Sequence, residues 1–290
     1  MLIRDAIQSI KDFSYGKDMT GRPINPVTTH DQILFGDANQ ELTGIVTCIW
    51  PDVGVIRKAK ELGYNLIITH ENMFYNDETR PVWLESNRIF QEKEQLIQDW
   101  GGVIWRDHDY LHSKVPIDNG KMTDGICYAM AKRLGWLDYV MGDQSLPIEF
   151  EIPETKASDL AAYIAEKFDL NGARLIGDAD AKIRKVRLAM HLIGKFDDGT
   201  TVATDRDDID CLLTMELTDY TTSEYIRDAA QLGHGKCMIS IGHFNLEQPG
   251  MEYMASWLPQ VIGSGVPVTF VSTGDTYQYI TRNKSQEGNA

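Results

Sequence analysis

The sequence predicts an α/β fold, in which a mainly parallel sheet carries helices on both faces and a smaller α+β domain is inserted into it. Short apolar segments alternate with helical segments over residues 41–136, an order typical of parallel strands joined by helical crossovers. These apolar segments are continuous rather than alternating, which indicates strands buried on both faces. The pattern changes near residue 142 and returns at residue 236, which favours an insertion.

The elements of the first domain follow from apolar spacing and from residues that start or stop helices. Residues 1–18 have apolar side chains at helical spacing broken by charges, and we expect an amphipathic helix of the fold rather than a signal peptide. Pro51 suits the first turn of a helix and Gly63 its end. The remaining expected elements are strands at 41–50, 65–70 and 102–108 and helices at 51–64, 80–101 and 124–136.

The middle of the chain mixes alternating segments, helices and an acidic stretch, as in a small α+β unit. The buried-strand pattern returns in KCMISIGH (236–243), and a helix at 247–262 and a strand near the end of the chain follow it. We therefore expect a discontinuous metal-binding domain of residues 1–141 and 236–290, with residues 142–235 as the inserted domain. The polar segment 281–290 is expected to fray.

Composition excludes several classes of partner. The chain has 290 residues, a formal net charge of −15 and a pI near 4.8, so its surface repels a phosphate backbone and nucleic acid is not an expected partner. The best basic segment, 182–187, is short and strand-like. No apolar run reaches the roughly 18 residues of a membrane span. The four cysteines form no Cys-x-x-Cys pair, which favours reduced thiols in a cytoplasmic protein over a disulfide framework.

Histidines end three of the apolar strands, at His70, His108 and His243. Ligands of open α/β sheets bind beyond the carboxyl ends of the strands, so the three imidazoles are delivered to the edge where function usually resides. A second potential metal ligand lies close to each of these histidines in the sequence. Glu71 follows His70 directly, and His112 and Glu247 stand four residues after His108 and His243.

Spacing of four places two donors on the same side of a helical turn, where they can chelate one ion or flank two. Imidazole together with carboxylate suits Zn, Fe, Mn, Co or Ni better than Ca or Mg. We therefore predict a divalent transition-metal site, with one or two ions, formed by His70, Glu71, His112, His243 and Glu247. Each pair alone fits an ordinary helix surface. Of the other histidines, His30 and His234 are read as loop and turn residues and His191 as a satisfied core residue.

At these residues the chain resembles the Nif-three-like family of dinuclear metal proteins, whose members are often labelled as the second type of GTP cyclohydrolase one. The segments HDQILFGD, GYNLIITHENMFY, WRDHDYLHS and ISIGHFNLEQPGMEYMASWL carry the resemblance, the last being the most specific. It implies a Nif-three-like fold of two α/β lobes and a homohexameric ring with metal sites facing an internal cavity.

Two positions depart from the family pattern. Glu71 stands where the family has a second His, and His112 stands where it has the Asp that helps to bridge two ions. Both versions total three imidazoles and two carboxylates, which favours retained metal binding. A neutral imidazole bridges cations poorly, so Glu247 bridges alone, Glu71 helps it, or a single ion binds well. Glu216 resembles a family position near the site and is expected only as a supporting group.

Three functions remain open. In a metal-dependent hydrolase acting on a small-molecule substrate, metal-bound water attacks a carbon or phosphorus centre, and His108 is the expected catalytic residue, orienting the water or carrying its proton. His30, Tyr75 and Arg106 are further candidates for the same cavity. No G-x-x-x-x-G-K loop supports nucleotide binding. The alternatives are a non-enzymatic metal carrier or regulatory adaptor, and a structural oligomer without functional metal.

Overall fold

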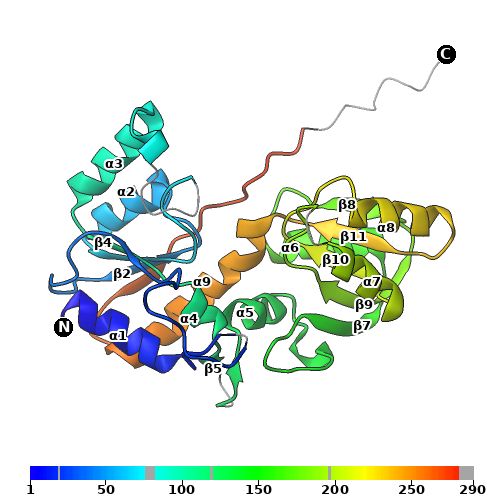
Figure 1. The fold of residues 1–290 in the computed structure, drawn as a ribbon, viewed down its shortest axis with the longest axis horizontal. Helices are drawn as coiled ribbons and strands as arrows, with labels where there is room; N and C mark the ends of the chain where they lie inside the picture. Colours follow the sequence, from blue (N-terminus) through cyan, green and yellow to red (C-terminus); the bar gives the residue numbers. More distant parts are fainter. Residues whose placement is uncertain (19, 76–81, 118–119, 195–196, 281–290) are drawn as a thin grey trace. The chain divides into compact units, whose positions relative to one another are not determined.

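The computed structural model describes the whole chain except residues 19, 76–81, 118–119, 195–196 and 281–290. The chain forms two compact units, each assembled from two stretches of sequence. The first unit contains Met1–Ile152 and Leu246–Thr273, and the second contains Pro153–Asn245 and Gly274–Ala290. The expectation for residues 281–290 lies outside the described residues. Figure 1 shows the elements of both units in sequence colours.

A five-stranded sheet in the order β1-β4-β3-β2-β12 forms the centre of the first unit. Neighbouring strands pair in parallel except at the edge, where β1 runs antiparallel to β4. All residues of β2, β3 and β4 are buried, as the continuous apolar segments predicted, because such strands are covered on both faces. The strands are β1 (Ile33–Phe35), β2 (Ile45–Cys48), β3 (Leu66–Thr69), β4 (Val103–Arg106) and β12 (Val268–Phe270).

Side chains cap the start of several helices of the first unit. Asp52 accepts a hydrogen bond from the Val55 amide at the start of α2 (Val53–Leu62), and Gly63 ends the helix in the left-handed conformation. The remaining elements are α1 (Ile3–Phe13), η1 (Val82–Leu84), α3 (Arg88–Trp100), α4 (Asp109–His112), β5 (Val115–Pro116), β6 (Met122–Thr123), α5 (Gly125–Arg133) and η2 (Leu137–Tyr139).

The second unit has its own five-stranded sheet, in the order β7-β9-β10-β11-β8. Strands β9, β10 and β11 are parallel, and β8 runs antiparallel to β11. The elements are β7 (Glu149–Lys156), α6 (Ala157–Lys167), β8 (Arg174–Gly177), β9 (Lys182–Leu188), α7 (Asp198–Arg206), β10 (Cys211–Thr214), α8 (Thr222–Gln231) and β11 (Cys237–Ser240). Helix α9 (His243–Ile262) begins in the second unit and continues into the first.

Strand β11 differs from the expectation in its sheet. The apolar segment 236–243 was expected to return to the first domain, but β11 pairs with β10, with Cys237 beside Cys211. The chain returns to the first sheet later, through α9 and β12. An apolar strand pattern predicts that a strand is buried, but it does not identify the strand's neighbours, so the unit boundaries fall at other residues than those expected.

The two sheets have separate cores. One apolar cluster of the first unit includes Ile56, Ile67, Phe90 and Ile104, and one of the second includes Leu212, Ile226 and Met238. All four cysteines are buried and none is in a disulfide. Among the described residues, no helix combines the length and apolar character that crossing a membrane requires. The mixed α/β fold class is therefore confirmed, with a mainly parallel sheet in the first unit.

Candidate metal centre

His70 is fully buried directly after β3, and its two ring nitrogens have different surroundings. Nδ1 lies 3.1 Å from the backbone carbonyl oxygen of Asp107, so Nδ1 carries the proton and donates it, and Nε2 holds the lone pair. Nε2 is buried without a hydrogen-bond partner among the described residues. Burial, and then the neighbouring His108 and His112, hold the pKa of His70 well below its ordinary value. This imidazole is therefore neutral and suited to bind a cation.

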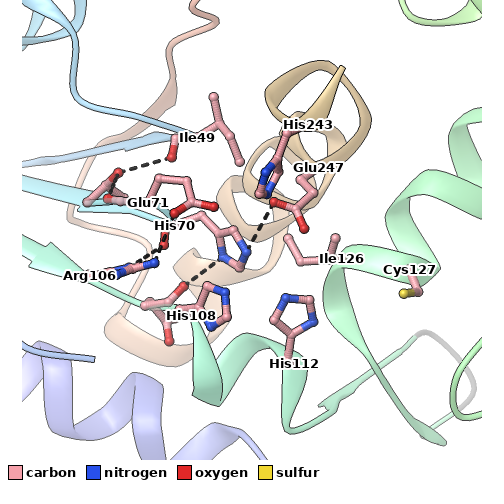
Figure 2. A network of polar contacts seen from close by, with 12 residues as sticks. Ile49, His70, Glu71, Arg106, His108, His112, Ile126, Cys127, His243 and Glu247 are labelled. Atoms are coloured by element: carbon pink, nitrogen blue, oxygen red, sulfur yellow. Dashed lines mark hydrogen bonds and ion pairs between the residues drawn. The ribbon is translucent and has the colours of Figure 1, made fainter. Parts of the chain in front are cut away.

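Three imidazole rings of the first unit lie against one another (Figure 2). The His70 and His108 rings stack with centroids 4.5 Å apart, and the His112 ring meets them edge-on at 5.1 and 4.9 Å. His108 follows β4, and α4 then carries the chain through one turn to His112. The helical turn expected from the four-residue spacing is present. One donor atom from each ring lies within 4.8 Å of the others, so the three rings are close enough to bind a common ion.

Asp124 orients His112. The Nδ1 atom of His112 lies 2.8 Å from Asp124 Oδ2, while Oδ1 of the same carboxylate accepts the Ile126 and Cys127 amides at the start of α5. Burial works against the charged imidazole, but Asp124 and Glu247 outweigh it and raise the pKa of His112 to about 9. A cation at this site must therefore displace a proton from His112.

Glu247 brings a buried carboxylate to this cluster from α9. Its Oε2 atom lies 3.6 Å from His70 Nε2, and its side chain is 2% exposed. Gly250, one turn later, lets α9 approach α5, because a Cβ there would lie 2.3 Å from Ile126 Cδ1 and 3.2 Å from Ile126 Cα. Donors of one tetrahedral zinc ion lie roughly 3.4 Å apart, given bonds of about 2.0–2.2 Å. The separation of His70 and Glu247 fits such an ion.

Glu71 is held by Arg106. The Arg106 Nη2 atom donates to Glu71 Oε2 at 2.9 Å, and the Arg106 Nε atom donates to the His70 carbonyl oxygen. A carboxylate bound by arginine through one oxygen can still offer the other oxygen to a cation, and such partners orient metal ligands. Arg106, expected near the site, therefore contacts a predicted ligand rather than facing open space.

His30 and His108 share one carboxylate. Their Nδ1 atoms lie 3.0 and 2.9 Å from Asp109 Oδ1. Burial raises the pKa of Asp109, but hydrogen bonds from His108, Thr29 and His30 outweigh it and hold that pKa far below the usual range, so the group stays ionised. His30 thus reaches the histidine cluster through Asp109. Tyr75, another candidate for the same cavity, is 43% exposed.

Among the described residues of the first unit, two groups of possible donors share His70, and a third comprises His30, His108 and Asp109. Of the two that share His70, one comprises His70, His108 and His112, and the other comprises His70, Glu71 and Glu247; within each group the donor atoms lie within 4.8 Å of one another. With Nδ1 turned to a carbonyl, His70 offers a lone pair to a single ion through Nε2. Imidazoles held by carbonyl and carboxylate acceptors are typical of transition-metal ligands, so these residues fit a divalent ion.

His243 lies in the second unit, at the first residue of α9 and one helical turn before Glu247. Its Nδ1 atom is 2.6 Å from Glu216 Oε1, and His191 Nδ1 is 2.8 Å from the other oxygen, Glu216 Oε2. The interpretation of His191 as a core residue is wrong, because its side chain is 49% exposed and lies beyond the end of β9.

Sequence reasoning missed the acidic groups that hold the imidazoles. Asp109 stands beside His108, and Asp124 precedes a helix in an N-cap position. The position of Asp109 between His108 and His112 is a sequence feature that could have identified it as a partner of these histidines. No local signal shows that a helix cap twelve residues from His112 also accepts a hydrogen bond from its ring.

Comparison with known proteins identifies relatives along nearly the whole chain. A family model described as Duf34/NIF3 (NGG1p interacting factor 3) matches residues 31–276. A Clostridium perfringens protein named "GTP cyclohydrolase 1 type 2 homolog" is 21% identical over 294 residues, covering 97% of this chain and all of the relative. A Clostridium acetobutylicum protein of the same name is 22% identical over 259 residues, covering 88% of this chain and 89% of the relative.

Solved structures share the fold. A Bacillus cereus protein related to NIF3 superposes with a TM-score of 0.70 at 13% identity, covering 97% of this chain and 99% of that one. A hypothetical protein of Staphylococcus aureus superposes with a TM-score of 0.69 at 19% identity, with the same coverage. At these identities the likeness concerns the fold.

Proposed function

Because the chain belongs to the Duf34/NIF3 (NGG1p interacting factor 3) family, we propose that it binds a divalent transition metal and uses it for hydrolysis. The proposed ligands are His70, Glu71, His112, His243 and Glu247. The observation that carries the proposal is the His70 ring, whose Nδ1 faces a carbonyl while its Nε2 is buried 3.6 Å from a Glu247 oxygen. Burying a polar nitrogen without a partner is costly, and a cation between the two groups would remove that cost.

A bound divalent ion would supply Lewis acidity and lower the pKa of a coordinated water toward neutrality. The chain's own groups orient the imidazoles. Asp124 holds His112, and the Asp107 carbonyl holds His70. Arg106 binds one oxygen of Glu71 and so fixes the position of this carboxylate. The net charge of −15 adds a long-range attraction for cations.

His108 is the proposed proton carrier. Its Nδ1 atom is fixed by Asp109, and its ring stacks on His70, so the imidazole is oriented next to the proposed ligands. This pairing of an imidazole with an ionised carboxylate resembles the arrangement that holds a general base in one tautomer. Asp109 acts here as a positioning residue.

Metal content tests the first part of the proposal. We expect elemental analysis of untagged protein to find zinc, iron, manganese, cobalt or nickel, and the double substitution His243→Ala with Glu247→Ala to abolish it. His70→Ala should remove the ion nearest His70, whereas His234→Ala, at an exposed histidine, should change nothing. Unaltered metal in both the double variant and His70→Ala would refute the ligand set.

Turnover tests the second part. Metal-loaded protein is assayed against phosphoesters, cyclic amidines and nucleotides, including GTP because two relatives carry a GTP cyclohydrolase name. Hydrolysis that depends on metal and on His108 would support an enzyme. Reversible metal exchange without turnover would instead support the carrier or adaptor. The homohexamer implied by the family resemblance is a separate proposal, which light scattering of the purified protein tests.

A further inference from the structure

The second unit has a histidine and carboxylate cluster of its own, and its position follows from the sheet. Strands β9, β10 and β11 are parallel neighbours, and their carboxyl ends lead to His191, Glu216 and His243. Leu188 of β9 pairs with Leu213 of β10. Beyond the ends of these strands, His191 forms a β-bridge with Glu216, and the two residues have the same separation in sequence as Leu188 and Leu213. The unbroken register therefore brings three metal-ligating residue types to the edge of a sheet where ligands usually bind.

Glu216 holds both imidazoles at once, one on each carboxylate oxygen, at 2.6 Å for His243 and 2.8 Å for His191. The two rings lie 4.9 Å apart, edge to face. Both Nδ1 atoms are directed to the carboxylate, so an ion bound by all three residues would replace the protons that these contacts share. One donor atom from each of the three residues lies within 4.8 Å of the others, which small rotations can contract to the donor spacing of one ion.

The side chains of His191, Glu216 and His243 are 49%, 34% and 24% exposed. An ion could therefore enter from solvent and keep an open coordination position. The cluster thus joins one carboxylate to two imidazoles within hydrogen-bond distance. Two imidazoles and one glutamate are the ligand set of a zinc ion that retains a water.

We propose that His191, Glu216 and His243 form a second divalent-metal site of the zinc class, held entirely by the second unit. All three donors lie within Pro153–Asn245, and of them only His243 also belongs to the ligand set proposed above. In this assignment His243 binds the same ion as His191. Glu247, one helical turn later, binds the ion near His70. His191 is then a metal ligand that the sequence pattern did not identify.

The test is a titration of the full-length, metal-stripped protein with Zn²⁺, followed by calorimetry, and with Co²⁺, followed by visible absorption. We expect His191→Ala and Glu216→Gln each to lose one equivalent of Zn²⁺ per chain and to keep the equivalent that His70→Ala removes. His70→Ala should show the reverse pattern. His234→Ala is the matched control, and circular dichroism checks that each variant is folded.

A second measurement needs no variant. Diethyl pyrocarbonate should modify His191 in the metal-stripped wild-type protein, and one equivalent of Zn²⁺ beyond that bound by the first centre should protect it at least tenfold, as read by peptide mass spectrometry. Unchanged stoichiometry in His191→Ala, or equal modification of His191 with and without Zn²⁺, overturns the second site. Loss of binding only in His70→Ala would support the first centre and reject the second, so the two proposals fail separately.

Discussion

Asp124 and His112 are joined by a 2.8 Å contact between Oδ2 and Nδ1, while the other oxygen of Asp124 caps helix α5. One carboxylate thus stabilises the start of a helix and fixes the tautomer of a proposed metal ligand. The stability of α5 and the affinity for metal are therefore linked through a single side chain.

Asp124→Ala should have two effects. Loss of the cap should destabilise the protein by about 1 kcal/mol, and loss of the His112 partner should weaken metal binding roughly 10- to 100-fold. Urea unfolding and Zn²⁺ calorimetry measure the two effects. Asp52→Ala is the control, because Asp52 caps α2 through the Val55 amide and belongs to no metal-ligating group in the described part of the chain. Equal affinities in the two variants would contradict the link.

Metal affinity should depend on pH through His112. Its pKa of about 9 means that the ring is protonated at neutral pH and must lose the proton to bind metal, so the apparent Kd should rise about tenfold for each unit of pH below 9. Calorimetry at pH 7.5 in buffers of different ionisation enthalpy should show one proton released. Asp124→Asn, which removes the raising charge, should move this dependence to lower pH. Binding without proton release at pH 7.5 would count against His112 as a ligand.

The metal-free protein should show the opposite trend in stability. The pKa of His112 is raised from 6.5 to about 9, so its interaction with Asp124 stabilises the fold fully below about pH 6.5 and is lost as pH rises through 9. Thermal unfolding of chelator-treated protein between pH 6 and pH 10 measures this loss. In His112→Gln the part of the pH dependence due to this group should vanish. A wild-type curve that coincides with that of His112→Gln over this range would exclude the contribution.

His108→Gln separates a proton carrier from a ligand. If His108 carries a proton, turnover should fall about 10²- to 10⁴-fold with metal content unchanged. Asp109→Asn, which removes the negative charge beside His108 and His30, should shift the pH profile of the rate while metal remains bound. A fall in metal content in His108→Gln would instead make His108 a ligand alongside His70 and His112, with which it forms a donor group.

The sequence predicted the parts of the fold that depend on local spacing. His70 and His108 follow β3 and β4, and the helical turn between His108 and His112 is present. These features depend on apolar periodicity and on residues adjacent in the chain, which a single sequence contains. Gly63, predicted to end a helix, adopts a left-handed φ of 71° at the end of α2.

Long-range pairing could not be predicted in the same way. The apolar pattern of β11 fits either sheet, and only the full set of strand contacts places it beside β10. His191 lies in an apolar segment, but the strand ends at Leu188, before reaching it. The contact of Asp124 with His112 links two elements whose approach depends on packing around Leu111 and Gly125. Each of these features depends on the tertiary arrangement.

The pairing register of β9 and β10 continues to His191 and Glu216. The contact between these two residues therefore depends on the number of residues that follow β9. Successive side chains of an extended strand point to opposite faces, so deleting one residue between Leu188 and His191 would turn the imidazole away from Glu216. Relatives that differ by one residue there would lack this pair while retaining all three residue types. Spacing in this segment, rather than composition, therefore distinguishes chains that can form the pair from those that cannot.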